Sequence, residues 1–326
     1  MSALSPPPQL VDRFRADVAA LGPAPGRLAV AVSGGPDSVA LLLLAAAAYP
    51  EQVHAATVDH GLRPESAAEA RFVADLCRAL EVPHATLAVD VDTARASIQQ
   101  SAREARYLAL DGWMKAGRIA MLATAHHIDD QAETLMMRLL RGAGVGGLAG
   151  VRARTLVPAP GSRRLLIRPL LGWRRHELRA IVDAAGIVAV DDPSNRDTGY
   201  DRARMRQRLA ETSWIEPAPL ARAAGALGEA DEALDWAAAQ LWDERVTQGR
   251  NGIRWSPRGI PAELRRRIVI AILARLAPDA PPPRGQEVGR LLGVLENGGT
   301  ATLAGIQAKG GSSWLFSTAP PRKRSG

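Results

Sequence analysis

The sequence predicts an α/β fold in which a parallel sheet carries helices on both faces, followed by a smaller, mainly helical C-terminal domain that ends in a hairpin. Short apolar runs, typical of buried strands, alternate with helical patterns through the first half of the chain. The links between these elements are short, which favours one layered domain. The chain has 326 residues, of which 47% are hydrophobic, and this is enough for two domains with cores of their own.

Four strand patterns and four helix patterns alternate in the first half of the chain. The apolar run Leu28–Val32 is closed by Ser-Gly-Gly-Pro, which indicates a buried strand followed by a turn. The same reasoning predicts strands at 28–32, 53–59, 84–90 and 118–125, and helices at 37–49, 65–81, 95–116 and 130–141. Beyond a glycine-rich segment we expect a helix at 174–185, a short strand at 187–190 and a turn at 192–195.

A proline-containing stretch at 214–219 marks the expected domain boundary. We therefore predict one domain over residues 1–214 and a second over residues 215–326. The second domain is expected to contain helices at 220–246, 262–276 and 284–295 and a hairpin over 300–316.

The composition excludes several classes of protein. The single cysteine, Cys77, cannot form an internal disulfide, which excludes a disulfide scaffold and a cysteine-rich zinc site. No apolar run reaches the roughly 18 residues that a membrane span needs. The N-terminal segment has prolines and charges where a signal peptide would be apolar. We therefore expect a cytoplasmic protein.

The chain is basic, with 41 Lys and Arg against 34 Asp and Glu and a net charge of +7. This balance favours a polyanion such as a nucleic acid as the partner. Almost all of the basic residues are arginines, however, and a GC-rich genome produces that bias without selection for binding. The charge alone therefore leaves both explanations open.

The segment SGGPDS at 33–38 lies where the first strand ends and the first helix begins. Gly34 and Gly35 allow a tight turn in which successive N–H groups face one anion at the helix N-terminus. Ser33 and Ser38 add hydroxyl donors, and Asp37 could hold Mg²⁺ against a phosphate. An ordinary turn with Asp37 as a helix cap is the alternative. No Gly-Lys-Ser/Thr follows, so this is not a Walker A loop.

A second polar group, AHHIDDQAET at 125–134, follows the fourth predicted strand. Asp130 and Glu133 have the spacing of a capping box, which is a purely structural explanation. That explanation accounts for neither the two histidines nor Asp129. If the strand order reverses between the first and fourth strands, their carboxyl ends flank one crevice. Asp37 would then face this cluster across the crevice.

Basic residues elsewhere are candidates for substrate binding, although a solvated helix face or a loop explains each of them as well. Arg103 and Arg106 lie three positions apart, on one face of the predicted helix 95–116. The remaining basic candidates are His60, Arg63, Arg202, Arg204 and Arg206.

Cys77 lies among regularly spaced apolar residues, and this pattern predicts a thiol that is packed in the core.

Taken together, these segments resemble the N-type ATP pyrophosphatase (PP-loop) family and, more narrowly, the tRNA(Ile)-lysidine synthetases within it. SGGxDS marks only the superfamily, whereas the segments that follow it are much more specific in this order. The resemblance covers most of residues 28–210 and, more weakly, the chain to about residue 316. The matching segments are SGGPDS at 33–38, VDHGLR at 58–63, AREARY at 102–107, TAHHIDDQAET at 124–134, RPLL at 168–171, DPSN at 192–195 and YDRAR at 200–204.

The resemblance implies a ligase that forms a carbon–nitrogen bond. Such an enzyme uses ATP to attach L-lysine to C2 of the wobble cytidine, C34, of a tRNA(Ile) with anticodon CAU. Adenylation of the cytidine releases diphosphate, the lysine amine attacks C2, and AMP leaves. The product, lysidine, switches decoding from AUG to AUA. The implied domains are a Rossmann-like PP-loop catalytic domain over 1–214 and a helical tRNA-binding domain over 215–326.

The resemblance also implies roles for the candidate residues. ATP is expected at Ser33, Gly34, Gly35, Pro36, Asp37 and Ser38, with Asp37 as the candidate ligand of Mg²⁺. Catalysis and lysine binding are expected at Asp130, Glu133, Asp129, His127 and Arg106. The target base or its phosphate is expected at His60, Arg63 and Arg103, and the tRNA backbone at Arg202, Arg204 and Arg206. The implied partners are tRNA(Ile), L-lysine and ATP, and a homodimer is compatible with the sequence.

Two other functions stay open. A tRNA thiolating enzyme would use the same scaffold, but sulfur transfer needs a persulfide cysteine or a cysteine-held cluster, and a core-like Cys77 is a poor candidate. A non-catalytic nucleotide- and RNA-binding protein would keep the glycine turn without needing the acidic cluster opposite it.

Overall fold

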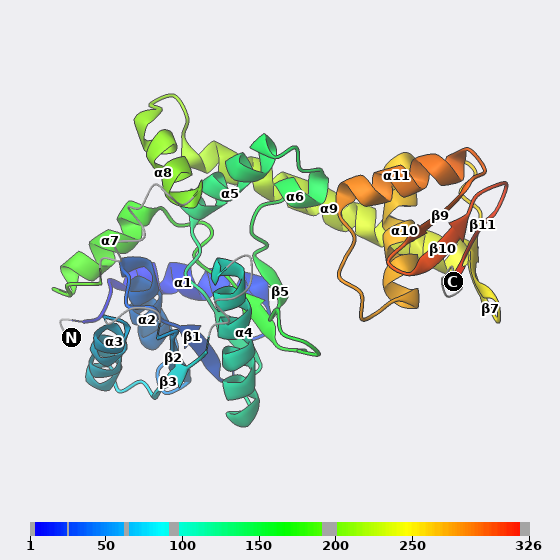
Figure 1. Ribbon diagram of the computed structural model, residues 1–326. Coiled ribbons are helices and arrows are strands. Elements are labelled where there is room, and N and C mark those ends of the chain that lie inside the picture. The colour runs from blue at the N-terminus through cyan, green and yellow to red at the C-terminus, as the bar shows by residue number, and fades with distance from the viewer. Residues whose placement is uncertain (1–3, 25, 62–64, 91–97, 191–200, 320–326) are drawn as a thin grey trace. The chain divides into compact units, whose positions relative to one another are not determined.

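The computed structural model describes residues 4–24, 26–61, 65–90, 98–190 and 201–319. The chain divides into two compact units, Met1–Gly228 and Glu229–Gly326. Each unit has a sheet of its own (Figure 1). The domain boundary between residues 214 and 215 stays a prediction, and so do the catalytic and tRNA-binding roles of the two domains. Within the described ranges, no helix combines the length and the apolar character needed to cross a membrane.

The strands of the first unit are β1 (Leu28–Ala31), β2 (Val53–Asp59), β3 (His84–Ala88), β4 (Met121–Ala123), β5 (Arg154–Leu156) and β6 (Leu165–Ile167). They form one sheet in the order β3-β2-β1-β4-β6-β5. All neighbours are parallel except β5, which pairs with β6 in the antiparallel direction at the edge. The chain runs outward from β1 to β3 and then crosses to β4, so the strand order reverses between β1 and β4. A ligand crevice is expected at that reversal.

The helices of the first unit are α1 (Pro8–Leu21), α2 (Pro36–Ala48), α3 (Ser66–Ala79), α4 (Ile98–Ala116), α5 (Ile128–Leu140), α6 (Val145–Leu148), α7 (Arg175–Ala184) and α8 (Asp201–Glu211). Alternate residues of β1 face opposite sides. Leu28 and Val30 join a core with α1, α2, α3 and α7, whereas Ala29 joins a second core with α4. The predicted sheet with helices on both faces is therefore confirmed.

Several elements differ from the predictions. Residues 187–190 are not a strand; the Val190 N–H donates instead to the Gly34 carbonyl oxygen at 3.0 Å, so this segment lies against the loop after β1. The sequence patterns also missed α1, β5 and β6. All three residues of β5 are exposed, so the strand has no apolar pattern to detect. The turn predicted at 192–195 lies outside the described residues.

The second unit contains an antiparallel sheet in the order β7-β8-β11-β10-β9. Its strands are β7 (Val246–Gly249), β8 (Gly252–Trp255), β9 (Thr300–Leu303), β10 (Ile306–Lys309) and β11 (Trp314–Thr318). The helices are α10 (Ala262–Leu276) and α11 (Gly285–Glu296), and α9 (Pro217–Arg245) contains the division between the units. The predicted hairpin is present as β9, β10 and β11, and β7 and β8 extend it. Trp255 and Trp314 pack edge to face in its core, with ring centres 5.3 Å apart.

The buried helix α2 is expected to tolerate substitution least. Leu42 is completely buried in the first core. Replacing Leu42 with Ala should lower the free energy of unfolding by about 2–5 kcal/mol, because it removes buried methyl groups and leaves a cavity. Chemical denaturation measures this change. Leu108→Ala is the control, because that side chain is 60% exposed, and it should cost less than about 0.5 kcal/mol. Equal losses in the two variants would contradict the central place of α2.

Candidate active site

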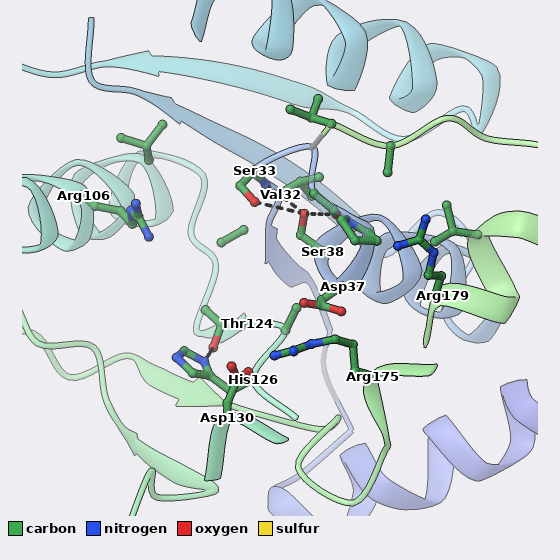
Figure 2. A pocket seen from close by; sticks show the side chains of 18 of the residues that line it. Val32, Ser33, Asp37, Ser38, Arg106, Thr124, His126, Asp130, Arg175 and Arg179 are labelled. Carbon is green, nitrogen blue, oxygen red and sulfur yellow. Dashed lines mark hydrogen bonds between the residues drawn. The ribbon is translucent and has the colours of Figure 1, made fainter. Parts of the chain in front are cut away.

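A cavity of about 860 Å³ opens at the carboxyl ends of β1 and β4. This volume is in the range of small-molecule sites. The cavity is lined by the loop after β1, by the segment after β4, and by residues of α4, α7 and α8. Figure 2 shows Ser33, Asp37, Asp130 and Arg175 around it. The structure therefore brings the glycine-rich loop and the His/Asp cluster to one space, at the strand reversal.

The loop at 33–38 requires a glycine at its second position. Gly34 has a φ of +88°, in the left-handed region that side chains disfavour. A Cβ atom there would also lie only 3.0 Å from Cγ2 of Val190. The Val190 N–H donates to the Gly34 carbonyl oxygen, so the segment 187–190 packs against this turn and stabilises it.

Two serine hydroxyls hold the loop against the first turn of α2. The Ser38 hydroxyl donates to the Gly35 carbonyl oxygen at 2.9 Å and accepts the Ser33 N–H at 3.1 Å. The hydroxyl oxygens of Ser33 and Ser38 are 3.2 Å apart. The N–H groups of Asp37 and Ser38 lie in the first helical turn, which has no acceptors of its own for them. The turn therefore presents donors and a helix dipole to an anion.

His127 connects the loop to the acidic cluster. Its Nε2 atom lies 3.3 Å from Asp37 Oδ2 and 3.5 Å from Asp130 Oδ2, and its Nδ1 atom lies 3.5 Å from Asp129 Oδ2. Burial by itself lowers the pKa of His127, but the contacts with Asp129 and Asp37 and the charge of Asp130 raise it to about 9. The imidazole is therefore a cation at neutral pH, shared by three carboxylates.

Asp130 and Glu133 differ in what surrounds them. α5 begins at Ile128, and Asp130 Oδ2 accepts the His127 N–H at 3.0 Å, so Asp130 caps this helix. Glu133 lies a turn further along and is not part of the cap. The capping explanation therefore accounts for Asp130 and not for Glu133.

Glu133 is 2% exposed and is surrounded by three arginines. Arg175 Nη2 lies 3.0 Å from Oε1, Arg206 Nε lies 2.8 Å from Oε1, and Arg202 Nε lies 3.0 Å from Oε2. Arg202 Nη2 also reaches Asp130 Oδ1 at 2.9 Å. Burial raises the pKa of Glu133, but the guanidinium groups of Arg206 and Arg202 outweigh it and lower the pKa. Two arginines expected on tRNA phosphates are thus bound to carboxylates here.

The residues expected at the target base also come together. Arg106 Nη2 lies 3.3 Å from His60 Nε2, and Arg103 and Arg106 both line the cavity. Burial and the charge of Arg106 lower the pKa of His60, so its imidazole is neutral at pH 7. Arg103 lies over the ring of Tyr107, 5.0 Å from its centre. Arg63 lies outside the described residues.

Arg204 faces away from this arrangement. It pairs with Asp201 at the start of α8, and its side chain is about half exposed. Arg202 and Arg206, four positions apart, bind Glu133, whereas Arg204 lies between them in sequence and is not among the residues that line the cavity. The three arginines at alternate positions therefore lie on two faces of α8. Arg202 and Arg206 face Glu133, whereas the Arg204 guanidinium lies on the opposite, outer face.

Sequence reasoning missed the contribution of α7. Arg175 and Arg179 line the cavity beside the loop at 33–38 (Figure 2). The Arg175 N–H also donates to Asp129 Oδ2 at 2.9 Å, which fixes the start of α7 against the acidic cluster. The spacing of four positions, which places both arginines on one helix face, was the available signal.

Asp37 is suited to bind a divalent cation. Its Oδ1 atom is buried and has no hydrogen-bond partner, whereas Oδ2 faces His127. No group of three or more His, Cys, Asp or Glu side chains that could hold a metal occurs in the described part of the chain. Asp37 Oδ1 is the carboxylate oxygen that would hold Mg²⁺, and the ion would supply positive charge against the phosphates of a substrate.

Cys77 is unsuited to sulfur transfer. It is completely buried in the first core, and burial raises the pKa of its thiol to about 12. It is therefore a thiol at neutral pH, whereas the nucleophile in persulfide chemistry is a thiolate.

A comparison with solved structures shows the fold. A U34-tRNA thiolase from Methanococcus maripaludis with its [4Fe-4S] cluster is 16% identical, with a TM-score of 0.54 over 69% of this chain and 78% of that chain. At this identity the similarity concerns the architecture alone.

Comparisons of sequence identify the family. The model of the PP-loop domain matches residues 10–213. A tRNA(Ile)-lysidine synthase of Novosphingobium aromaticivorans is 47% identical over 95% of this chain and 94% of its own length. Another, of Zymomonas mobilis, is 40% identical over 93% of this chain and 91% of its own length. The chain therefore belongs to the tRNA(Ile)-lysidine synthase family of PP-loop proteins.

Proposed function

We propose that this chain ligates L-lysine to C2 of C34 in a tRNA(Ile) with anticodon CAU, at the expense of ATP. In the first step, O2 of the cytidine attacks the α-phosphorus of ATP and diphosphate leaves. In the second step, the lysine amine attacks C2 and AMP leaves. The lysidine formed pairs with A, so the tRNA decodes AUA instead of AUG.

The observation that carries this proposal is the meeting of a glycine-rich loop and an acidic residue, Asp130, in one cavity. The loop at 33–38 follows β1, and Asp130 follows β4, its neighbour in the sheet. Glu133 lies buried next to Asp130, paired with three arginines that line the cavity. A ligase of this kind must hold a triphosphate beside an amine, because the activated base reacts with both in turn. Two charged subsites at adjacent strand ends meet that requirement.

The loop suits adenylation better than transfer of a γ-phosphate. C2 of cytosine resembles the carbon of a urea, so its oxygen must become a leaving group before an amine can displace it. Donors at the start of α2 would hold the departing diphosphate, and Asp37 Oδ1 would bind a Mg²⁺ ion that offsets the charge of the phosphates. Arg175 and Arg179 lie on the same cavity wall and would add positive charge as the bond to diphosphate breaks.

The target base would enter from the side of α4. Its removal from the anticodon stack is required for any group to reach C2. Arg106, in contact with His60, and Arg103 would then bind the base or its phosphate. A neutral His60 can donate or accept a hydrogen bond, whereas the arginines only donate.

Lysine binding at Asp130 and Glu133 would require an exchange of cations. Arg202 now bridges both carboxylates, through Nε to Glu133 and Nη2 to Asp130. It is the most exposed of the three arginines on Glu133, at 45% against 32% for Arg175 and 31% for Arg206. An ammonium group of lysine has the same charge and could take its place. The released guanidinium would then be available to a tRNA phosphate.

Mg²⁺ and L-lysine as ligands are proposals that rest on Asp37 and on the acidic cluster. A homodimer and a cytoplasmic location stay predictions.

The direct test is diphosphate release from ATP in the presence of lysine and the CAU-anticodon tRNA, together with incorporation of labelled lysine. Both signals should require the tRNA, and incorporation should require lysine. A tRNA whose C34 is replaced by U should give neither. Lysine incorporation that does not depend on C34, or its complete absence with the intact tRNA, would contradict the proposal.

Asp37→Asn should lower turnover by about 10²-fold or more, because it removes the negative charge proposed to hold Mg²⁺ against the phosphates. Steady-state kinetics over a range of Mg²⁺ concentrations measures this loss. Asp12→Asn is the matched control, since Asp12 is an exposed aspartate of α1, and it should leave turnover unchanged. If Asp37→Asn unfolds the protein, or is inactive only in proportion to its unfolded fraction, a structural cap explains Asp37 instead.

Arg204→Ala should weaken tRNA binding and reduce its dependence on salt by about one counterion, since a phosphate contact releases one condensed cation. Filter binding across a series of KCl concentrations gives the slope of log affinity against log salt concentration. Arg78→Ala is the control, because Arg78 is an exposed arginine that also pairs with an aspartate three positions away. A slope identical in both variants and the unmodified protein would argue against a phosphate contact at Arg204.

A further inference from the structure

His126 is a half-buried residue that lines the cavity. Neither the sequence motifs nor the proposed reaction assigns it a role. It follows β4, lines the cavity, and stands immediately before the cationic His127 (Figure 2). Its Nδ1 atom is 3.1 Å from the hydroxyl oxygen of Thr124, a buried residue. Among the described residues, no hydrogen bond to its Nε2 atom is formed. With the proton on Nδ1 donated to Thr124, Nε2 keeps a lone pair.

We propose that His126 Nε2 accepts the proton of the attacking lysine amine in the second step of the ligation. This inference rests on the proposed function. Attack by the neutral amine forms the C2–N bond and places a positive charge on that nitrogen. The proton then moves from nitrogen to Nε2. The C2–O bond breaks with its electron pair going to the oxygen, and AMP departs.

The carboxylates of the cavity are poorly placed for this task, because each is already engaged. Glu133 is bound by three guanidinium groups, and Asp130 accepts the His127 N–H and the Arg202 guanidinium. Asp129 accepts the Arg175 N–H and lies against His127. Asp37 faces His127 through Oδ2, and its Oδ1 suits a cation. A carboxylate oxygen that already accepts from a donor or contacts a cation has fewer lone pairs available for the amine proton.

His127 is excluded by its position. Its side chain is completely buried and is not among the residues that line the cavity. Both of its ring nitrogens lie within 3.5 Å of carboxylate oxygens of Asp37, Asp129 and Asp130. Of the two adjacent histidines, only His126 therefore has a ring nitrogen that can reach a substrate.

The charges that face His126 are almost all positive. They come from Arg103 on α4, Arg168 after β6, Arg202 on α8 and His127 beside it, and the residues that line the cavity also include Arg106, Arg175 and Asp130. Burial, followed by Arg168, Arg202 and Arg103, lowers the pKa of His126 to about 3. The ring is therefore neutral throughout the neutral range. Phosphates of ATP and tRNA would compensate these arginines and raise its basicity towards that of an ordinary imidazole.

Charges from both proposed subsites act on His126. Arg103 belongs to the wall proposed for the target base, and Arg202 to the cluster proposed for lysine. A base that takes the proton from the amine nitrogen once it has bonded to C2 must come within hydrogen-bond reach of that nitrogen, where the two subsites meet. Because bound phosphates raise the basicity of His126, proton transfer to it would be favoured only after ATP and tRNA have bound.

The test separates the two half-reactions in single turnovers with enzyme in excess over tRNA. His126→Asn keeps an amide near the position of Nδ1, for Thr124, and His126→Gln keeps one near the position of Nε2; neither amide is a base. Both variants should release diphosphate in a C34-dependent manner within about threefold of the unmodified rate. Both should transfer labelled lysine about 10²–10⁴-fold more slowly. The control is His176→Gln, an exposed histidine on α7, which should change neither rate.

Two further readouts distinguish a base from a structural part. Transfer by His126→Gly should be partly restored by added imidazole, and the restoration should grow with the fraction of neutral imidazole as the pH rises. Equal slowing of both half-reactions, normal lysine transfer in both amide variants, or no restoration by imidazole would each overturn the role of His126. If the unmodified protein itself shows no C34-dependent diphosphate release, the proposed function fails rather than this assignment.

Discussion

The buried carboxylate of Glu133 determines how the elements around the site are arranged. An isolated charge at 2% exposure would cost several kcal/mol, so it must be paired. Three guanidinium groups supply that pairing, one from α7 and two from α8. Because these helices follow β6 in the chain and α5 follows β4, a single buried charge links segments that are about 40 to 70 residues apart. The cavity walls follow from this convergence.

The carboxylates and the cations around the cavity are unevenly distributed. In the described part of the site, every carboxylate has a cationic neighbour, either His127 or an arginine. Arg103 and Arg106 of α4 line the same cavity, and no carboxylate of that cluster pairs with either of them. The cavity thus combines a balanced half with a cationic half. A triphosphate and a tRNA backbone complement the cationic half, and a small ammonium compound can enter the balanced half only by exchange with a cation already there.

The features that could be predicted from the sequence share a local physical cause. Apolar runs closed by glycine and proline gave the strands β1 and β2 and the start of α2, and the strand reversal brought Asp37 to the acidic cluster. Features that depend on tertiary contacts could not be predicted from the sequence. The strand predicted at 187–190 has the right residue types, but it packs on Gly34 instead of joining a sheet. β5 has no buried residue, so no periodicity reveals it. The pairing of Arg202 and Arg206 with Glu133 spans about 70 residues, and a basic segment gives no sign of which acid it will meet.

The proposed reaction requires ATP to be activated in the cavity at the carboxyl ends of β1 and β4. A crystal structure of the protein with Mg²⁺ and α,β-methylene-ATP, which cannot release diphosphate, tests this most directly. The expected result places the β- and γ-phosphates about 3 Å from the N–H groups of the loop at 33–38. Asp37 is expected on the metal, and the α-phosphorus is expected to face the space beside His126 and Arg106. A triphosphate bound anywhere else on the chain, with this loop unoccupied at saturating nucleotide, would contradict the account.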